Sequence, residues 1–184
     1  MRPSKRDLIL DAALRVVARD GVTAVTYESV AEEAGLTKGG LVYHFPSRET
    51  LLTALQEHLA DQWEANLTNA AGKPVDQLTD RERDVAYARV AATSADHAEL
   101  LLILEASTTP ELAAPWTRLM NIWTPPTPTK APLTDDEATR IIARLAADGL
   151  WLYDTITGIP MSSEVRAELG ERIANLVNPN HSGA

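Results

Sequence analysis

The stretch that decides the fold spans residues 26–52 and reads Thr-Tyr-Glu-Ser-Val-Ala-Glu-Glu-Ala-Gly-Leu-Thr-Lys-Gly-Gly-Leu-Val-Tyr-His-Phe-Pro-Ser-Arg-Glu-Thr-Leu-Leu. It predicts a short helix after Thr26 that ends at Gly35, and a second short helix from Thr37 to about Tyr43. Both threonines are favourable N-caps. Two short helices joined by a small turn residue form a helix-turn-helix, whose second helix enters the major groove of DNA by its N-terminal end.

The rest of the chain is also predicted to be helical. Apolar residues recur at helical spacing throughout, and no stretch alternates as a strand would. We therefore expect an all-α protein of about nine helices. Outside the quoted stretch the helices are expected over residues 6–20, from 47 onward, 75–92, 96–107, from 110 onward, 135–158 and 162–177. Four prolines between residues 124 and 133 predict an exposed loop, because proline lacks the backbone donor that a helix interior needs.

Composition and charge narrow the class of protein. The chain has 184 residues, of which 45% are apolar, and no cysteine. The length suffices for a sizeable core, and the absence of cysteine excludes disulfide frameworks and zinc-thiolate sites. No apolar run is long enough for a signal peptide or a bilayer span, so we expect a soluble cytoplasmic protein without membrane contact.

The net charge of −9 is distributed unevenly. The first fifty residues carry seven basic and seven acidic groups, so the remaining 134 carry the whole excess. A neutral N-terminal part can approach phosphate through local basic groups while the acidic body stays away. The alternative is that the body is acidic only for solubility, which is compatible with the first interpretation.

Signatures of catalysis are missing from the sequence. His44, His58, His97 and His181 have no paired helical spacing for a metal. There is no glycine-rich phosphate loop after a strand and no nucleophile elbow. We expect no catalytic residue, no metal and no cofactor. The alternative, a helical enzyme with a chance helix-turn-helix, would need a second tight polar cluster in the body.

Residues 6–52 resemble the N-terminal domain of TetR-family transcriptional regulators. The matching features are Asp20-Gly21, Thr26, Val30-Ala31, Ala34-Gly35, Thr37-Lys38-Gly39, Leu41, Tyr43-His44-Phe45, Ser47-Arg48 and Leu51-Leu52. The resemblance implies a DNA-binding regulator in which residues 1–46 bind double-stranded DNA as a helix-turn-helix domain. Residues 47–184 would form a larger helical domain that binds a small-molecule effector and forms a homodimer. A repressor released by its effector is the expected mode.

Eight residues are expected to contact DNA: Thr26, Thr37, Lys38, Gly39, Gly40, Tyr43, His44 and Arg48. The threonines lie at helix N-termini, which attract phosphate, and the glycines let the backbone approach DNA. Lys38 suits a base edge or a phosphate, whereas the polar tips of Tyr43 and His44 suit phosphate oxygens. The alternatives are that Tyr43 packs in the core, that His44 is an ordinary surface histidine, and that Gly39 and Gly40 form a loop rather than a helix. Family members often carry Ser or Thr in place of Gly40, so one polar contact is lost here.

The start of the helix at Ser47 poses two questions. Arg48 falls in its first turn, where a cation is unfavourable unless a phosphate lies nearby. Thr50 stands where a capping box has Glu, so we expect the box to be incomplete.

The last two predicted helices each carry an apolar stripe. Two such helices from each of two copies could close a four-helix bundle. The expected interface residues are Ile142, Leu145, Leu152, Ile156, Val165, Leu169, Ile173 and Leu176. A two-fold dimer would present both reading helices to successive major grooves and would require a near-palindromic operator. The alternative is that the stripes face only the protein's own core.

A ligand pocket is predicted from aromatic, methionine and carboxylate side chains in the body. The candidates are Tyr87, Leu104, Glu105, Trp116, Met120, Trp123, Asp148 and Trp151. Such residues make adaptable apolar pockets, so we expect a small, largely apolar or aromatic effector, and a carboxylate would favour a cation. The alternatives are a plain aromatic core with solvated carboxylates, and a DNA-binding module that recruits a protein partner without any ligand.

Overall fold

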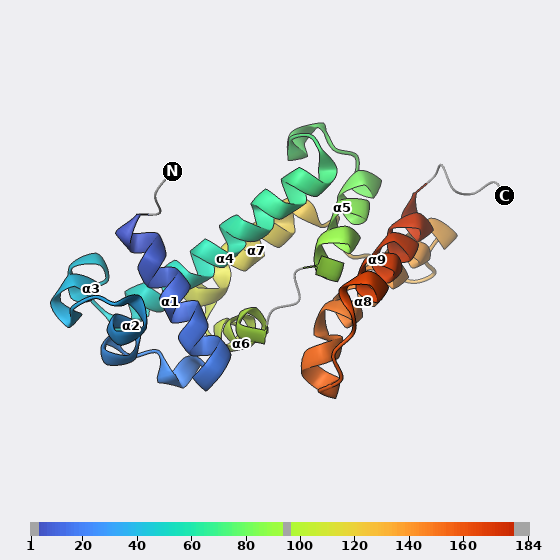
Figure 1. The fold of residues 1–184 in the computed structure, drawn as a ribbon. Coiled ribbons are helices and arrows are strands. Elements are labelled where there is room, and N and C mark those ends of the chain that lie inside the picture. The colour runs from blue at the N-terminus through green and yellow to red at the C-terminus, as the bar shows by residue number, and fades with distance from the viewer. Residues whose placement is uncertain (1–3, 94–96, 179–184) are drawn as a thin grey trace. The chain divides into compact units, whose positions relative to one another are not determined.

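The computed structural model describes residues 4–93 and 97–178. Every regular element within them is helical (Figure 1), which confirms the all-α prediction and the expected nine α-helices. In chain order the elements are α1 (Lys5–Asp20), η1 (Val22–Ala24), α2 (Tyr27–Ala34), α3 (Lys38–His44), α4 (Arg48–Ala71), η2 (Val75–Gln77), α5 (Asp80–Thr93), α6 (His97–Ala106), α7 (Pro110–Trp123), α8 (Asp135–Thr157) and α9 (Ser163–Val177), where η marks a short 3-10 helix. The predicted start of the sixth helix, residue 96, lies outside the described residues.

The chain divides into two compact units. Unit 1 combines the chain up to Asp61 with α6 and with α7 up to Thr117. Unit 2 combines Gln62 to the end of α5 with the chain from Arg118 onward. The two units are defined by which residues pack together. The predicted boundary between residues 46 and 47 instead separates DNA binding from effector binding and dimerisation, and it stays a prediction.

The first three helices of unit 1 form where local signals are strongest. Thr26 accepts a hydrogen bond from the backbone N–H of Ser29 and so caps α2. Gly35 ends α2 in the left-handed conformation, with φ of 65°, which glycine adopts without strain. α1 packs against α2 and α6. Its buried face holds Ile9, Leu10, Ala12, Ala13, Val16 and Val17.

Two predictions about helix starts were wrong. At the start of α4 the backbone N–H of Ser47 donates to Thr50 Oγ1 (3.0 Å), and the Thr50 N–H donates to Ser47 Oγ (3.1 Å). The capping box is therefore complete, because a threonine hydroxyl accepts the bond that Glu would accept. The fifth helix begins at Asp80 rather than at residue 75, since Thr79 and Glu82 form a capping box of their own.

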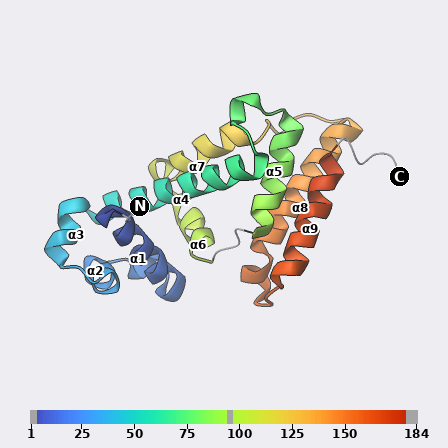
Figure 2. The same ribbon diagram turned by 45° about the horizontal axis from the view of Figure 1, so that its top comes forward.

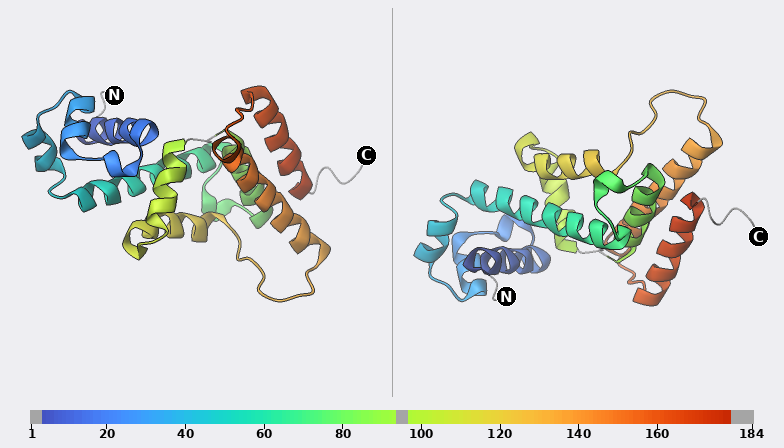
Figure 3. Two further views of the ribbon diagram at one scale, coloured as in Figure 1. Left: turned by 90° about the horizontal axis from the view of Figure 1, so that it is seen from below. Right: turned by 90° about the horizontal axis from the view of Figure 1, so that it is seen from above.

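In unit 2, α5 packs against both α8 and α9, and α8 packs against α9 (Figure 2). The close approach of α9 to α5 depends on Gly170. A Cβ atom added there would lie 2.5 Å from Cβ of Ala92, which is closer than side-chain atoms can approach. Residues 124–134 form the expected loop between α7 and α8 (Figure 3). This loop supplies one wall of a cavity in unit 2.

Candidate DNA interface and ligand cavity

The predicted reading helix, α3, includes both adjacent glycines. Its N-cap Thr37 accepts a hydrogen bond from the Gly40 N–H (3.2 Å). A Cβ atom at Gly39 would meet nothing within 4 Å, so this side of the helix is open. The alternative that the glycines form a loop is therefore wrong. Because each glycine weakens a helix by roughly 1 kcal/mol relative to alanine, their place in so short a helix fits close approach to a partner surface.

Tyr43 points away from the protein. Its side chain is 84% exposed, and its ring meets that of His44 edge-on at 5.2 Å between centroids. Tyr27 of the same unit is instead partly buried, and its hydroxyl donates to the carbonyl oxygen of Phe45 (2.8 Å). The alternative that Tyr43 packs in the core is wrong, and its phenol is available to a phosphate.

Lys38 lies in the first turn of α3 and forms an ion pair with Glu28 of α2. Both side chains are largely exposed. The hydrogen bond from Lys38 is the main cause that lowers the pKa of the Glu28 carboxyl. This partner could not be predicted from the sequence, because ten residues and the Gly35 turn separate Lys38 from Glu28 and no helical spacing relates them. A phosphate or base that binds Lys38 must compete with this carboxylate.

Arg48 has a structural role that its position alone did not indicate. Its Nε donates to the carbonyl oxygen of Val25, and its Nη2 to that of Val22, both at 2.9 Å. These bonds tie the start of α4 to η1. They explain the cation in the first turn of α4, so a nearby phosphate is not required there.

Thr26 likewise uses its polar groups within the protein. Its backbone N–H donates to Ser29 Oγ and its hydroxyl caps Ser29 N, both at 3.1 Å. The remaining N–H groups in the first turn of α2 have no acceptor within the helix, so they can still attract an anion. Contact of Thr26 with DNA stays a prediction.

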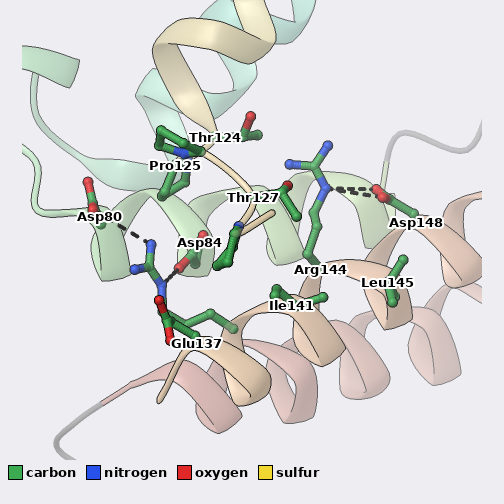
Figure 4. Close-up of a pocket in the computed structure, with 13 residues that line it drawn as sticks. Asp80, Asp84, Thr124, Pro125, Thr127, Glu137, Ile141, Arg144, Leu145 and Asp148 are labelled. Atoms are coloured by element: carbon green, nitrogen blue, oxygen red, sulfur yellow. Dashed lines mark hydrogen bonds and ion pairs between the residues drawn. The ribbon is translucent and has the colours of Figure 1, made fainter. Parts of the chain in front are cut away.

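Unit 2 contains a cavity of about 390 Å³ between α5, α8 and the loop after α7 (Figure 4). Its charged lining consists of Asp80, Asp84, Glu137, Arg140, Arg144 and Asp148. Its apolar lining consists of Pro125, Pro126, Pro128, Ile141 and Leu145, with Thr124 and Thr127 between them. Carboxylates thus outnumber guanidinium groups by two, and the cavity as a whole favours positive charge.

At one end of the cavity Arg140 is held by two carboxylates. Its Nε donates to Asp84 Oδ2 at 2.6 Å, and its Nη2 lies 3.8 Å from Asp80 Oδ2. Burial raises the pKa of the Asp84 carboxyl, although the bond with Arg140 acts in the opposite direction.

At the other end, Arg144 and Asp148 belong to a group that we name the Arg144 cluster, whose other two members, Tyr87 and Met120, contact Arg144 but do not themselves line the cavity. Arg144 Nε donates to both carboxylate oxygens of Asp148 at 3.1 Å, and the guanidinium carbon lies 3.6 Å from the centroid of the Tyr87 ring. The Tyr87 hydroxyl donates to Asp148 Oδ1 at 2.7 Å, and Arg144 Nη2 lies 3.4 Å from Met120 Sδ. Tyr87, Asp148 and Met120 were predicted from the sequence as ligand-binding residues. Arg144 was not, although its spacing of four residues from Asp148 was a signal.

The structure does not bring the other ligand candidates to this cavity. Trp151 contacts Trp63 edge-on, with 6.2 Å between ring centroids, and Trp63 in turn contacts Tyr87. Trp123 is fully buried, and its indole N–H has no hydrogen-bond partner within the described part of the chain. The cavity is lined by neither Trp123 nor Trp116.

Three candidates belong to unit 1, which corrects the expectation of a shared interior. The Trp116 indole N–H donates to Gln56 Oε1 (2.8 Å), so Trp116 and Trp123 lie in different units despite sharing α7. Leu104 is 57% exposed and Glu105 is also exposed. The reason is that α6 buries the opposite face, which includes Ala98, Leu102 and Ala106.

Within the described part of the chain, the apolar stripes of α8 and α9 are not covered by the core. Ile142, Leu145, Ile156, Val165 and Leu176 are between 48% and 72% exposed, and Leu152, Leu169 and Ile173 are partly exposed. The two helices bury other faces instead: Ala143, Ala147 and Leu150 on α8, and Arg166, Gly170, Ala174 and Val177 on α9. The alternative that the stripes face only the core is wrong, and the dimer interface stays a prediction.

Comparison with known proteins identifies the family. A family model described as "Bacterial regulatory proteins, tetR family" matches residues 9–55, and one described as "Tetracyclin repressor-like, C-terminal domain" matches residues 83–178. The HTH-type transcriptional regulator BetI of Rhizobium meliloti (strain 1021) is 31% identical over 95% of this chain and 90% of BetI. This chain belongs to the TetR family of transcriptional regulators.

Other relatives agree with this assignment. The HTH-type transcriptional regulator RutR of Escherichia coli (strain K12) is 39% identical over 35% of this chain, and the match spans only 30% of RutR. A solved TetR-family structure from Streptomyces coelicolor A3 is 27% identical, covers 93% of this chain and 98% of its own, and has a TM-score of 0.60. The multidrug binding protein EbrR, complexed with imidazole, is 25% identical with a TM-score of 0.54 and covers 94% of this chain and 96% of EbrR.

Membership of the TetR family makes this protein a DNA-binding transcriptional regulator and confirms that it is not an enzyme. Over residues 4–93 and 97–178, no helix combines the length and apolar character needed to span a bilayer. The same described residues contain no group of three or more His, Asp or Glu side chains that could hold a metal ion.

Proposed function

We propose that this TetR-family regulator is a homodimeric repressor, which a small-molecule effector releases from a near-palindromic operator. The observation that carries the proposal is the cavity of about 390 Å³ in unit 2. A volume of this size suits a small organic molecule, and a protein that only recruited another protein would not need it. The similarity to EbrR, which is described as a multidrug binding protein, supports an effector of this kind.

Residues 1–46 would bind DNA through α3. The open backbone at Gly39, the exposed Lys38 and the projecting Tyr43 together form a surface that can enter the major groove. Lys38 would contact a base edge or a phosphate, and Tyr43 and His44 would contact phosphate oxygens.

Residues 47–184 would bind the effector and form the dimer. The exposed apolar stripes of α8 and α9 support association with a second copy, because uncovered apolar side chains in such a row are costly in water. A four-helix bundle made from α8 and α9 of both copies would bury them. Two-fold symmetry would then give the operator its near-palindromic sequence.

Repression and release would follow from linkage. An effector that binds better to the form with misplaced reading helices must lower DNA affinity by the same factor by which DNA lowers effector affinity. We propose α4 (Arg48–Ala71) as the connecting element, because it runs without interruption from unit 1 into unit 2.

One observation favours a second candidate function. The cavity is lined by neither Trp116 nor Trp123, where the sequence predicted the pocket, and α6 exposes Leu104. A regulator that recruits a protein partner through its helical body would use such a surface and would have no effector.

The first experiment is selection of duplex DNA from a randomised pool by the purified protein at low salt, followed by sequencing. A near-palindromic motif is expected, and it would supply the operator for a second step. In that step, binding of a candidate effector is measured by calorimetry with and without operator. Lower effector affinity in the presence of operator supports release, whereas equal affinity rules the coupling out. Failure to enrich any motif would overturn specific DNA binding through α3.

A further inference from the structure

We infer that the effector is an organic cation, and that the Arg144 guanidinium holds the place of its positive group on Tyr87 and Asp148 until the effector binds. This inference rests on the proposed function and names the effector class of its cavity. In the Arg144 cluster, the guanidinium of Arg144 lies on the ring face of Tyr87 and against the carboxylate of Asp148.

The surroundings of the Arg144 guanidinium are those of a cation-binding site. The guanidinium carbon is 3.6 Å from the centroid of the Tyr87 ring, well within the distance at which a ring face attracts a cation. Both oxygens of Asp148 accept from Arg144 Nε. The Tyr87 hydroxyl donates to Asp148 Oδ1 and so fixes the carboxylate beside the ring. Once Arg144 has turned away, an ammonium, amidinium or guanidinium group of a ligand would find the same two partners: Asp148 on the cavity wall and the ring face of Tyr87 that Arg144 covers.

Arg144 can leave this place when a ligand cation replaces its contact with the Tyr87 ring, because its other two contacts are weak. Its side chain is 30% exposed and that of Asp148 is 35% exposed, so solvent reaches both. A partly exposed ion pair between residues four apart on one helix contributes little to stability. The third contact, with Met120 Sδ at 3.4 Å, involves a weak acceptor. The flexible arginine side chain can therefore turn out into solvent when a ligand cation arrives.

The remaining lining disfavours an anionic effector. Arg140 is already bound by Asp84 and lies near Asp80, so its guanidinium is not free to hold an anion. Burial removes water from the Asp84 carboxyl and raises its pKa. An added anion nearby would therefore be unfavourable, and an added cation would be favourable.

The apolar part of the lining defines the rest of the effector. Ile141 and Leu145 of α8 lie next to Arg144 on the cavity wall, and Pro125 faces them from the loop after α7 (Figure 4). These side chains suit a flat apolar or aromatic body attached to the cationic group. A neutral aromatic molecule could lie against them but would gain nothing from Tyr87 and Asp148.

The test compares benzamidinium with benzamide, which has nearly the same shape and no charge. Binding of each to the full-length protein is measured by calorimetry for the wild type, Arg144→Ala and Asp148→Asn. Arg144→Ala should bind benzamidinium about tenfold more tightly than the wild type, because the competing guanidinium is gone. Asp148→Asn should bind it at least tenfold more weakly. Benzamide should respond to neither substitution.

A matched control removes an ion pair of the same kind outside the cavity. Arg172→Ala breaks the Arg172–Glu168 pair, also four residues apart, on α9. It should leave benzamidinium binding unchanged. Thermal unfolding of each variant checks that the fold is intact. Unchanged or weaker benzamidinium binding by Arg144→Ala, or no binding of benzamidinium by any variant at millimolar concentration, would overturn the inference.

Operator release separates this inference from the proposed function. If benzamidinium binds as expected but neither probe weakens the operator complex, the cation site stands and the proposed release fails. If benzamide releases the operator while benzamidinium does not bind, the proposed release stands and the cation site fails.

Discussion

The ammonium of Lys38 on α3 and the carboxylate of Glu28 on α2 form an ion pair on the exposed side of the helix-turn-helix. In the proposed reading helix α3, Lys38 lies in the first turn, so its partner should affect how the protein binds DNA. The carboxylate both competes with phosphate for the ammonium and repels phosphate directly.

Glu28→Gln should therefore strengthen binding to operator DNA by about three- to tenfold, since each tenfold step corresponds to only about 1.4 kcal/mol. Fluorescence anisotropy with labelled operator, measured over a range of salt concentrations, would detect the gain. Glu32→Gln is the matched control, because it removes the same charge from an exposed position of the same helix. If both variants gain equally, net charge rather than release of Lys38 explains the effect.

Tyr43→Ala should weaken DNA binding without unfolding the protein, because the side chain is 84% exposed. Loss of one phosphate hydrogen bond of about 1 kcal/mol corresponds to roughly fivefold lower affinity. The loss should be similar for specific and random DNA, since phosphate contacts carry no sequence information. Tyr43→Phe, which removes only the hydroxyl, should reproduce most of it. A lower melting temperature for Tyr43→Ala would contradict the exposed position.

Arg48→Ala should destabilise unit 1, in contrast to Tyr43→Ala. It removes two hydrogen bonds from a charged donor to the carbonyl groups of Val22 and Val25. We expect a loss of about 2 kcal/mol in the free energy of unfolding, from the usual range for bonds to charged groups. Arg48→Lys should recover part of it. If Arg48→Ala keeps full stability and loses DNA binding, the phosphate contact predicted from the sequence is the better explanation.

The helix-turn-helix could be predicted from sequence because its signals are local. Thr26, Gly35 and Thr37 each act within one turn of their own position, through caps and a left-handed glycine. The stripes on α8 and α9 were predictable for the same reason, since one helix period relates their members. The start of α4 was predicted, but its capping box was not, because Thr50 takes the part of the expected Glu. The start of α5 was missed although Thr79 and Glu82 form a box of the expected residue types.

The cavity could not be predicted with the same success, because it depends on contacts between distant segments. Asp84 and Arg140 are far apart in sequence and meet only when α5 packs on α8. The spacing of Trp116 and Trp123 places them on the same face of α7, but they belong to different compact units. Helical periodicity predicts which residues share a face, and not which neighbouring element covers that face.

Gly170→Ala should destabilise unit 2, although alanine is the better helix former. The added Cβ would lie 2.5 Å from Cβ of Ala92, so α9 and α5 must separate. Overpacking of this kind costs roughly 1–3 kcal/mol, against a gain of about 1 kcal/mol in helix propensity. Thermal unfolding should show a lower midpoint. Adding Ala92→Gly should restore part of the loss, and purely additive effects would contradict a direct clash.

Val165→Glu should convert the proposed dimer to a monomer. Val165 is 48% exposed on the stripe of α9, so a carboxylate there does not enter the core of its own subunit. It lies in the first turn of α9, where a negative charge favours the helix. In a two-fold dimer the substitution places two unpaired charges in an apolar contact, which is strongly unfavourable. Sedimentation velocity should show the dimer weakened by at least tenfold, with the melting temperature of the monomer retained.

Ala167→Glu is the control, because it introduces the same charge at an exposed position of the same helix, two residues further on and so on a different face. It should remain dimeric. Equal dissociation in both variants would indicate a general charge effect, and a wild type that is already monomeric would remove the basis for the dimer.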